Sequence, residues 1–212
     1  MITSFNPATD EVLSRFEPHR DSQIEERLAA AARAQKAWAA LDVQARRPYL
    51  LKVAQLLRAN KERYARTITL EMGKPLAEAV GEVEKCALNF EYYAEQGASF
   101  LADQPMPSAA SDSRLVYDPL GLVLAVMPWN YPFWQVMRAA APILVSGNAI
   151  VLKHASNVPQ CALAMEALFR EADVPEGLFT VLLVGGGEVD RLIADDRIAA
   201  VTFTGSTPVG RS

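Results

Sequence analysis

Polar or glycine-rich groups follow four apolar segments in the second half of the sequence, and each group suits a particular chemistry. The groups are Pro128-Trp129-Asn130, Lys153-His154-Ala155-Ser156, Gly185-Gly186-Gly187 and Thr204-Gly205-Ser206. An asparagine amide can donate to a developing oxyanion, and a lysine can bond a ribose hydroxyl or a phosphate. Glycines at a helix start let an anion approach backbone N–H groups. Together the four groups predict a nucleotide crevice with an oxyanion donor beside it.

Each group also has a simpler structural explanation. Trp129 alone suits an aromatic plug in a rigid turn, and Lys153 suits a solvated strand end. The segment 185–187 is compatible with a plain tight turn, because it lacks the G-x-G-x-x-G dinucleotide fingerprint. His154 is expected to be a packed neighbour rather than a base. The prediction of a crevice therefore depends on the recurrence of such groups after four successive segments.

The elements that would position these groups alternate between strand and helix. Short apolar runs predict strands at 121–127, 149–153, 178–184 and 198–204, with helices at 132–146, 157–172 and 188–194. Runs that are apolar throughout are typical of strands covered on both faces. The series predicts a parallel, doubly wound, Rossmann-like sheet, whose ligands bind at the carboxyl ends of the strands.

The first half has a different organisation. A hairpin is expected within 5–16, and residues 102–120, rich in Pro, Ser, Ala and Asp, form either a disordered stretch or an extended arm exposed for another subunit. The expected helices begin near 23 after a cap at Asp21 or Ser22, and continue at about 44–57, 63–71 and 76–101. The predicted units are thus a hairpin and helical part at 1–101, the arm at 102–120 and a Rossmann-like half at 121–212.

Composition excludes several classes of function. The 212 residues are half hydrophobic and carry a net charge of −4 without a basic run, which argues against a nucleic-acid partner. The most apolar stretch, 139–152, contains Pro142, Ser146, Gly147 and Asn148, and is too short to span a membrane. The N-terminus has no secretory pattern, so a cytoplasmic location is expected.

The two cysteines, Cys86 and Cys161, stand alone in helical segments. They are expected to be buried free thiols rather than a disulfide or metal ligands. The only histidines, His19 and His154, are not spaced as metal ligands either. No metal site is predicted.

Six short motifs resemble the aldehyde dehydrogenase superfamily and together span the whole chain. They are F-N-P-A-T-D-E-V, E-M-G-K-P, F-E-Y-Y-A-E, M-P-W-N-Y-P, V-L-K-H-A-S and F-T-G-S-T-P-V-G. Within the superfamily, W-Q-V-M-R and L-K-H-A-S-N-V look most like bacterial succinate-semialdehyde dehydrogenases.

The resemblance implies oxidation of a small aldehyde with NAD or NADP, through a cysteine thiohemiacetal and a thioester. Asn130 matches the side-chain donor of the oxyanion hole, and Arg138 matches an arginine that receives the distal carboxylate of succinate semialdehyde. The implied cofactor contacts are Pro128, Trp129, Lys153, Ala155, Ser156, Gly185, Gly205 and Ser206. A homo-oligomer, dimer or tetramer, is also implied.

The sequence departs from the family pattern at three points. Ser156 stands where members strict for NAD often carry a glutamate, so NADP is expected to be tolerated, with the preference open. Asp190 stands where a glycine is frequent. The family's cysteine nucleophile and glutamate base lie beyond the F-T-G-S-T motif, and neither Cys86, Cys161 nor Glu188 replaces them. The chain is thus expected to be the N-terminal portion of an incomplete aldehyde dehydrogenase fold, inactive alone.

Two other functions fit the same crevice. One is a stand-alone, non-catalytic nucleotide-binding or assembly module. The other is an acylating or phosphate-releasing relative of the aldehyde dehydrogenases. The sequence leaves both open.

Overall fold

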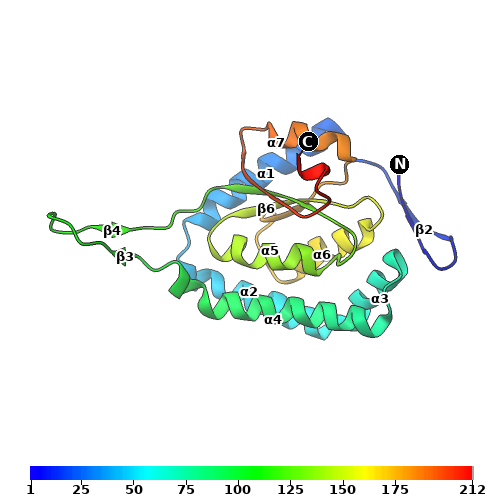
Figure 1. Ribbon diagram of the computed structural model, residues 1–212, viewed down its shortest axis with the longest axis horizontal. Helices are drawn as coiled ribbons and strands as arrows, with labels where there is room; N and C mark the ends of the chain where they lie inside the picture. Colours follow the sequence, from blue (N-terminus) through cyan, green and yellow to red (C-terminus); the bar gives the residue numbers. More distant parts are fainter. Residues whose placement is uncertain (212) are drawn as a thin grey trace.

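A four-stranded parallel sheet forms the centre of the molecule, a computed structural model in which residues 1–211 are described (Figure 1). Its strands are β5 (Leu122–Met127), β6 (Ala149–His154), β7 (Phe179–Val181) and β8 (Ile198–Phe203). They lie in the order β7-β6-β5-β8, so the direction in which strands are added reverses at β5. The predicted doubly wound parallel sheet is confirmed.

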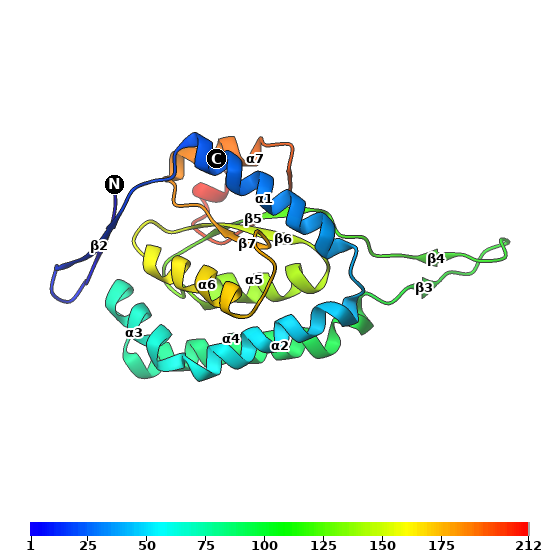
Figure 2. The ribbon, with the colours of Figure 1, turned by 180° about the vertical axis from the view of Figure 1, so that it is seen from behind.

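Helices cover the sheet on both faces and add a further layer on one side (Figures 1 and 2). One face carries α1 (Asp21–Ala39) and the short α7 (Val189–Ile193), while the other carries α5 (Trp134–Val145) and α6 (Pro159–Glu171). The outer layer consists of α2 (Val43–Ala59), α3 (Lys61–Met72) and α4 (Leu76–Phe100). The core fills the space between these layers, because each inner helix buries an apolar stripe against the sheet.

Two small antiparallel hairpins lie outside these layers. The first pairs β1 (Ile2–Phe5) with β2 (Val12–Phe16), as expected for 5–16. The second, within 102–120, pairs β3 (Gln104–Pro105) with β4 (Arg114–Leu115) and extends away from the body (Figure 1). In the structure the segment 102–120 thus contains a projecting hairpin.

Helix ends follow local chemistry, with one correction. Gly73 ends α3 in the left-handed region at φ 78°, and its N–H bonds Thr69 O, as the glycine predicted. The N-cap of α1 is Arg20, whose N–H donates to the Gln23 side chain, so the expected cap at Asp21 or Ser22 was wrong. Because the helix starts earlier, Asp21 lies in its first turn and is free to pair elsewhere.

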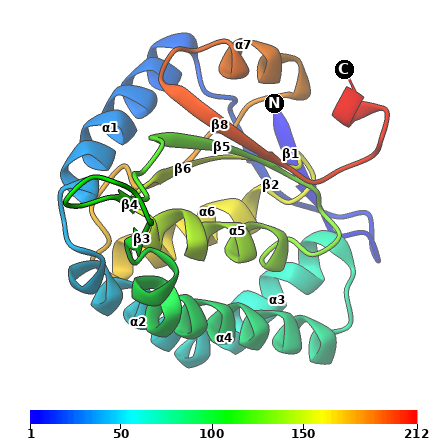
Figure 3. The ribbon, with the colours of Figure 1, turned by 60° about the vertical axis from the view of Figure 1, so that its left-hand side comes forward.

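Strand β8 also differs from expectation. Strands β5, β6 and β7 are buried almost throughout, but residues of β8 alternate, with Val201 43% and Phe203 38% exposed. Cover on both faces was therefore predicted wrongly for this strand. The physical reason is its place at the edge of the sheet, where β8 has β5 as its neighbouring strand and the short α7 packs near it (Figure 3).

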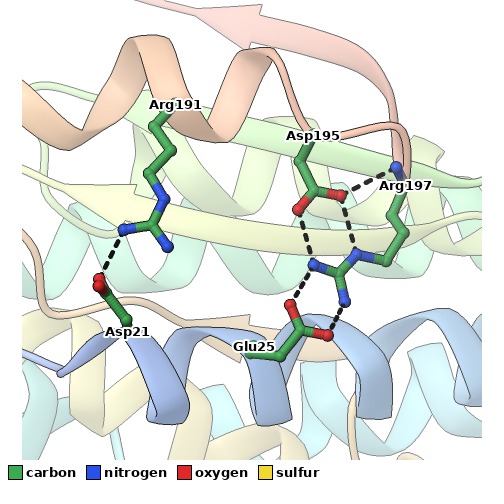
Figure 4. Close-up of polar contacts among 5 residues, drawn as sticks. All are labelled: Asp21, Glu25, Arg191, Asp195 and Arg197. Carbon is green, nitrogen blue, oxygen red and sulfur yellow. Dashed lines mark hydrogen bonds and ion pairs between the residues drawn. The ribbon is translucent and has the colours of Figure 1, made fainter.

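A network of ion pairs joins the connection before β8 to α1 (Figure 4). The Arg197 guanidinium makes two hydrogen bonds of 2.7 and 2.6 Å to Glu25, and it also bonds both oxygens of Asp195 at 2.8 and 2.6 Å. Arg191 bonds Asp21 at 2.5 Å. The hydrogen bonds from Arg197 lower the pKa values of Glu25 and Asp195. The network thus fixes where β8 enters the sheet.

We expect Arg197→Gln to lower the free energy of unfolding by about 1 kcal/mol, because both bidentate pairs are lost. Urea denaturation at low salt measures the loss, which should shrink at about 0.5 M NaCl through screening. Arg33→Gln is the matched control, since Arg33 is exposed on α1 and has no ion pair within residues 1–211. Equal losses in the two variants would contradict the role of the network.

Candidate functional site

The four groups predicted from the sequence all follow the carboxyl ends of the parallel strands. Parallel register pairs Met127 of β5 with His154 of β6, and Val126 of β5 with Phe203 of β8. Beyond the last pair, Thr204 N–H still donates to Val126 O at 3.1 Å. The segments after β5 and β8 therefore flank the point where the strand order reverses, which is where open α/β sheets bind ligands.

The Asn130 turn, residues 128–133, connects β5 to α5. Trp129 is half exposed and Asn130 is exposed. Within residues 1–211 the Asn130 amide has no hydrogen-bond partner, so it is free to bind a ligand. Pro128 is half buried and Pro132 is buried, and both restrict the backbone on either side of Asn130. The amide is therefore exposed while the backbone that carries it is anchored.

His154 holds this turn from the neighbouring strand. Ala155 N–H donates to its Nδ1 at 2.9 Å, so Nε2 carries the proton and donates to Pro132 O at 2.9 Å. Burial lowers the pKa of His154 to about 4, and the imidazole is neutral near pH 7. His154 thus lies packed against the turn, as expected, with both ring nitrogens used.

A buried carboxylate from α4 holds the other end of the turn. Glu82 Oε1 accepts from Phe133 N at 2.8 Å and from Trp134 N at 2.9 Å, and so bonds two free amides at the start of α5. Lys74 pairs with Glu82. The sequence carried a signal for this contact, because Glu82 lies on the buried stripe of α4 that includes Ala79. Sequence reasoning did not single out either charge.

The residues expected to bind the nucleotide begin at the end of β6. Lys153 is half buried, and burial lowers its pKa. Ala155 is half buried and Ser156 is exposed. A small cavity lies between the ends of β6 and β7, and its lining includes Ala155, Ser156 and residues 182–184. Of the residues expected to bind the adenosine half of a cofactor, Ala155 and Ser156 line this cavity, and Lys153 precedes them in β6.

The two glycine-rich turns, at 185–187 and 204–206, lie at the surface. Packing explains the glycine in the second turn but not in the first. A Cβ at Gly185 would meet no atom within 4 Å, so intramolecular packing does not demand a glycine there. A Cβ at Gly205 would lie 2.4 Å from Phe203 Cζ and would displace that ring. Ser206 is exposed, and its carbonyl accepts from Gly210 N at 3.0 Å. Gly205 therefore has a packing reason in addition to any cofactor contact.

Arg138 lies exposed in the second turn of α5, eight residues after Asn130 in the sequence. Its Nη2 donates to Thr204 Oγ1 at 2.8 Å and its Nε donates to Gln135 Oε1 at 2.9 Å. These two partners are neutral, so the guanidinium charge has no carboxylate partner within residues 1–211. The structure thus places a cation of α5 against Thr204, the first residue after β8.

The two cysteines lie in helices, Cys161 in the first turn of α6 and Cys86 within α4. Cys86 in α4 and Cys161 in α6 are buried, and burial raises the pKa of each thiol well above its ordinary value. Neither is a thiolate near neutral pH, and neither can act at the Asn130 turn. Within residues 1–211 no three metal-ligating side chains gather, and no helix is long and apolar enough to cross a membrane.

The sheet order 7-6-5-8, with ligand-type groups at the reversal point, is the arrangement of a dinucleotide-binding half-domain. The model of the aldehyde dehydrogenase family matches residues 1–212. The chain belongs to the aldehyde dehydrogenase family.

Two similar curated proteins are both named as succinate-semialdehyde dehydrogenases. A Synechocystis protein named "Probable succinate-semialdehyde dehydrogenase (NADP+)" is 46% identical over 211 residues, covering all of this chain and 46% of that protein. Succinate-semialdehyde dehydrogenase (NADP+) 1 of Mycobacterium tuberculosis is 44% identical, with all of this chain and 47% of that protein covered. The chain spans about half the length of the curated relatives it matches.

Similar solved structures include a succinic semialdehyde dehydrogenase and other aldehyde dehydrogenases. The succinic semialdehyde dehydrogenase of Streptococcus pyogenes, solved with NADP+ as the cofactor, superposes with a TM-score of 0.96 at 36% identity, covering all of this chain and 47% of that one. An aldehyde dehydrogenase from Brucella melitensis superposes with a TM-score of 0.93 at 34% identity, covering 99% of this chain and 44% of that one.

The lowered pKa of His154 predicts acid sensitivity. An unperturbed histidine protonates near pH 6.5, so the unfolded chain gains a proton there while the folded chain stays neutral down to about pH 4. Stability is therefore lost as pH falls through this window, by about 2 kcal/mol between pH 7 and pH 5. Urea denaturation of the parent and of His154→Asn should show a shallower dependence in the variant. Identical slopes would contradict the buried neutral imidazole.

Proposed function

We propose that this chain supplies the cofactor crevice and the oxyanion donor of an NAD(P)-dependent aldehyde dehydrogenase that oxidises succinate semialdehyde to succinate. The observation that carries the proposal is the free Asn130 amide at the point where the strand order reverses, with the Arg138 cation eight residues later in α5. Relatives named for this activity with NADP+ support it.

In the proposed reaction a cysteine thiolate from outside these 212 residues adds to the aldehyde carbon, and the carbonyl oxygen takes up the negative charge. Asn130 donates an N–H to that oxygen from a turn that needs no rearrangement. A bound NAD or NADP would supply the acceptor for the hydride that leaves the former aldehyde carbon, and a thioester would remain. Water then hydrolyses the resulting thioester and releases the carboxylate. Cys86 and Cys161 stay buried as neutral thiols throughout.

The residues at the strand ends fit a dinucleotide. Lys153 would bond the ribose next to the adenine, with Ala155 and Ser156 beside it, and Pro128 and Trp129 would line the crevice. The exposed glycines Gly185 and Gly205 and the exposed Ser206 would contact the cofactor beyond that ribose. Ser156 is short and neutral, so a 2′-phosphate meets no like charge at this position, which favours acceptance of NADP.

We expect Ser156→Glu in the full-length enzyme to weaken NADP binding at least about 10-fold, because a carboxylate beside the 2′-phosphate adds like-charge repulsion. NAD binding should hold or improve. Calorimetric titration with both cofactors measures the change, and Ser156→Gln is the matched control of equal size without the charge. An equal loss for NAD and NADP, or an equal effect of Gln and Glu, would contradict the assignment.

The substrate's distal carboxylate would bind Arg138. A guanidinium matches a carboxylate with two parallel hydrogen bonds, and the present partners of Arg138, Thr204 and Gln135, are neutral groups that a carboxylate can replace. A neutral aldehyde gains nothing from this contact. The pair of Asn130 and Arg138 would thus fix both ends of a four-carbon semialdehyde.

We expect Arg138→Ala in the full-length enzyme to raise KM for succinate semialdehyde about 10- to 100-fold, since a charge-assisted contact is lost. KM for a neutral aldehyde of similar length should change little, and it serves as the internal control. Steady-state kinetics with both substrates test this. A comparable rise for both would exclude Arg138 as the carboxylate site.

The arm at 102–120 is proposed to pair with another copy of the chain in a homo-oligomer, a dimer or a tetramer. Its edges are exposed, and Leu115, Val116 and Tyr117 present apolar surface to solvent. A cytoplasmic location is proposed with it, in keeping with two free buried cysteines.

A further inference from the structure

The Asn130 turn is held by elements that are distant in sequence. His154, on the neighbouring strand, donates to Pro132 O at 2.9 Å. Glu82, on α4, accepts from Phe133 N at 2.8 Å and Trp134 N at 2.9 Å. The backbone of residues 132–134 is thus fixed at its carbonyl and at two amides, directly after Asn130.

A second buried charge completes this arrangement. Lys74, in the connection between α3 and α4, pairs with Glu82 Oε2, and its Nζ lies 3.6 Å from the centroid of the Tyr131 ring. The side chains of Lys74 and Glu82 are 6% and 1% exposed. Their polar and cation–π contacts go to each other and to residues 131–134.

Stability alone does not account for this pair. Removing two charges from water is costly, and an apolar pair of similar volume often gives equal or greater stability. What an apolar pair cannot supply is an acceptor for the amides of Phe133 and Trp134, or a cation over Tyr131. The pair therefore specifies one geometry of the turn.

We propose that Glu82 is a positioning residue for Asn130, with Lys74 as its buried counter-charge. The inference rests on the proposed function, in which the Asn130 amide donates to the oxyanion. A donor of this kind is effective only when its position is set before the charge develops, and a displacement of about 1 Å can cost up to about 100-fold in rate. Glu82 sets the backbone after Asn130, and Lys74 pairs with Glu82 while packing on Tyr131.

Two double variants of the full-length enzyme distinguish the hydrogen-bond acceptor at position 82 from the volume of the side chain there. Lys74→Met with Glu82→Leu removes both charges and the acceptor. Lys74→Met with Glu82→Gln removes the charges but keeps an oxygen that accepts from the two amides. We expect kcat for aldehyde oxidation to fall roughly 10- to 100-fold in the first pair, and to stay within about 3-fold in the second. The dissociation constant for NADP should stay within about 2-fold in both, since the cofactor residues are unchanged.

Each double variant is also made in an Asn130→Ala background. If the pair acts through Asn130, its removal costs little more once the Asn130 amide is gone, so the two losses are far from additive. If Lys74→Met with Glu82→Leu lowers kcat by the same factor in both backgrounds, or leaves kcat unchanged, the positioning role is overturned. Should the Leu pair not fold, Glu82→Asp is used in the same cycle, because its shorter side chain cannot reach both amides.

The cycle keeps this inference separate from the proposed function. Asn130→Ala alone tests the function, and unchanged kcat in that variant would refute the oxyanion role of Asn130. A large loss in Asn130→Ala with additive losses in the double variants would refute only the positioning role of Glu82. Glu71→Gln is the control for a buried capping glutamate, since it alters the start of α6 rather than α5, and we expect its kcat within about 2-fold of the parent.

Discussion

Parallel pairing of β5 with β6 on one side and β8 on the other is the constraint on which the rest of the structure depends. Because parallel neighbours all end at the same edge, the segment after each strand is delivered to one place. β5 is central, so the Asn130 turn lies between the segments that follow β6 and β8. Because each parallel strand must begin at the same end of the sheet, the chain needs a crossover connection between strands, and the crossover helices form the layers on both faces.

Buried charges then tie those layers together. Glu82 reaches from α4 to the start of α5, and Glu71 reaches from α3 to the start of α6, where it accepts from the amides of Gln160 and Cys161 at 2.9 and 2.8 Å. In each case a carboxylate meets the positive end of a helix dipole and bonds amides that the helix itself leaves free. The outer helices thus orient the two helices that follow the candidate site's strands, in addition to covering them.

Much of this was accessible from sequence. The strands, the crossover helices and the glycine that ends α3 were predicted, because apolar runs and turn residues act locally. The exposed face of β8 was not, since an apolar run at a sheet edge looks like one at its centre. The cap of α1 was misplaced because Gln23, rather than Asp21 or Ser22, bonds the backbone at its start. For the candidate site, the sequence indicated Asn130, Lys153 and Arg138 but not the charges behind them.

By itself the sequence determined which segments are strands, where polar groups follow them, and that the motifs resemble aldehyde dehydrogenases. Only the tertiary structure decided that Glu82 and Lys74 hold the Asn130 turn, and that Arg138 meets Thr204. The physical reason is that propensity and periodicity are set by near neighbours in the chain. A hydrogen bond between residues some 50 positions apart, as from Phe133 to Glu82, exists only after packing has brought two elements together.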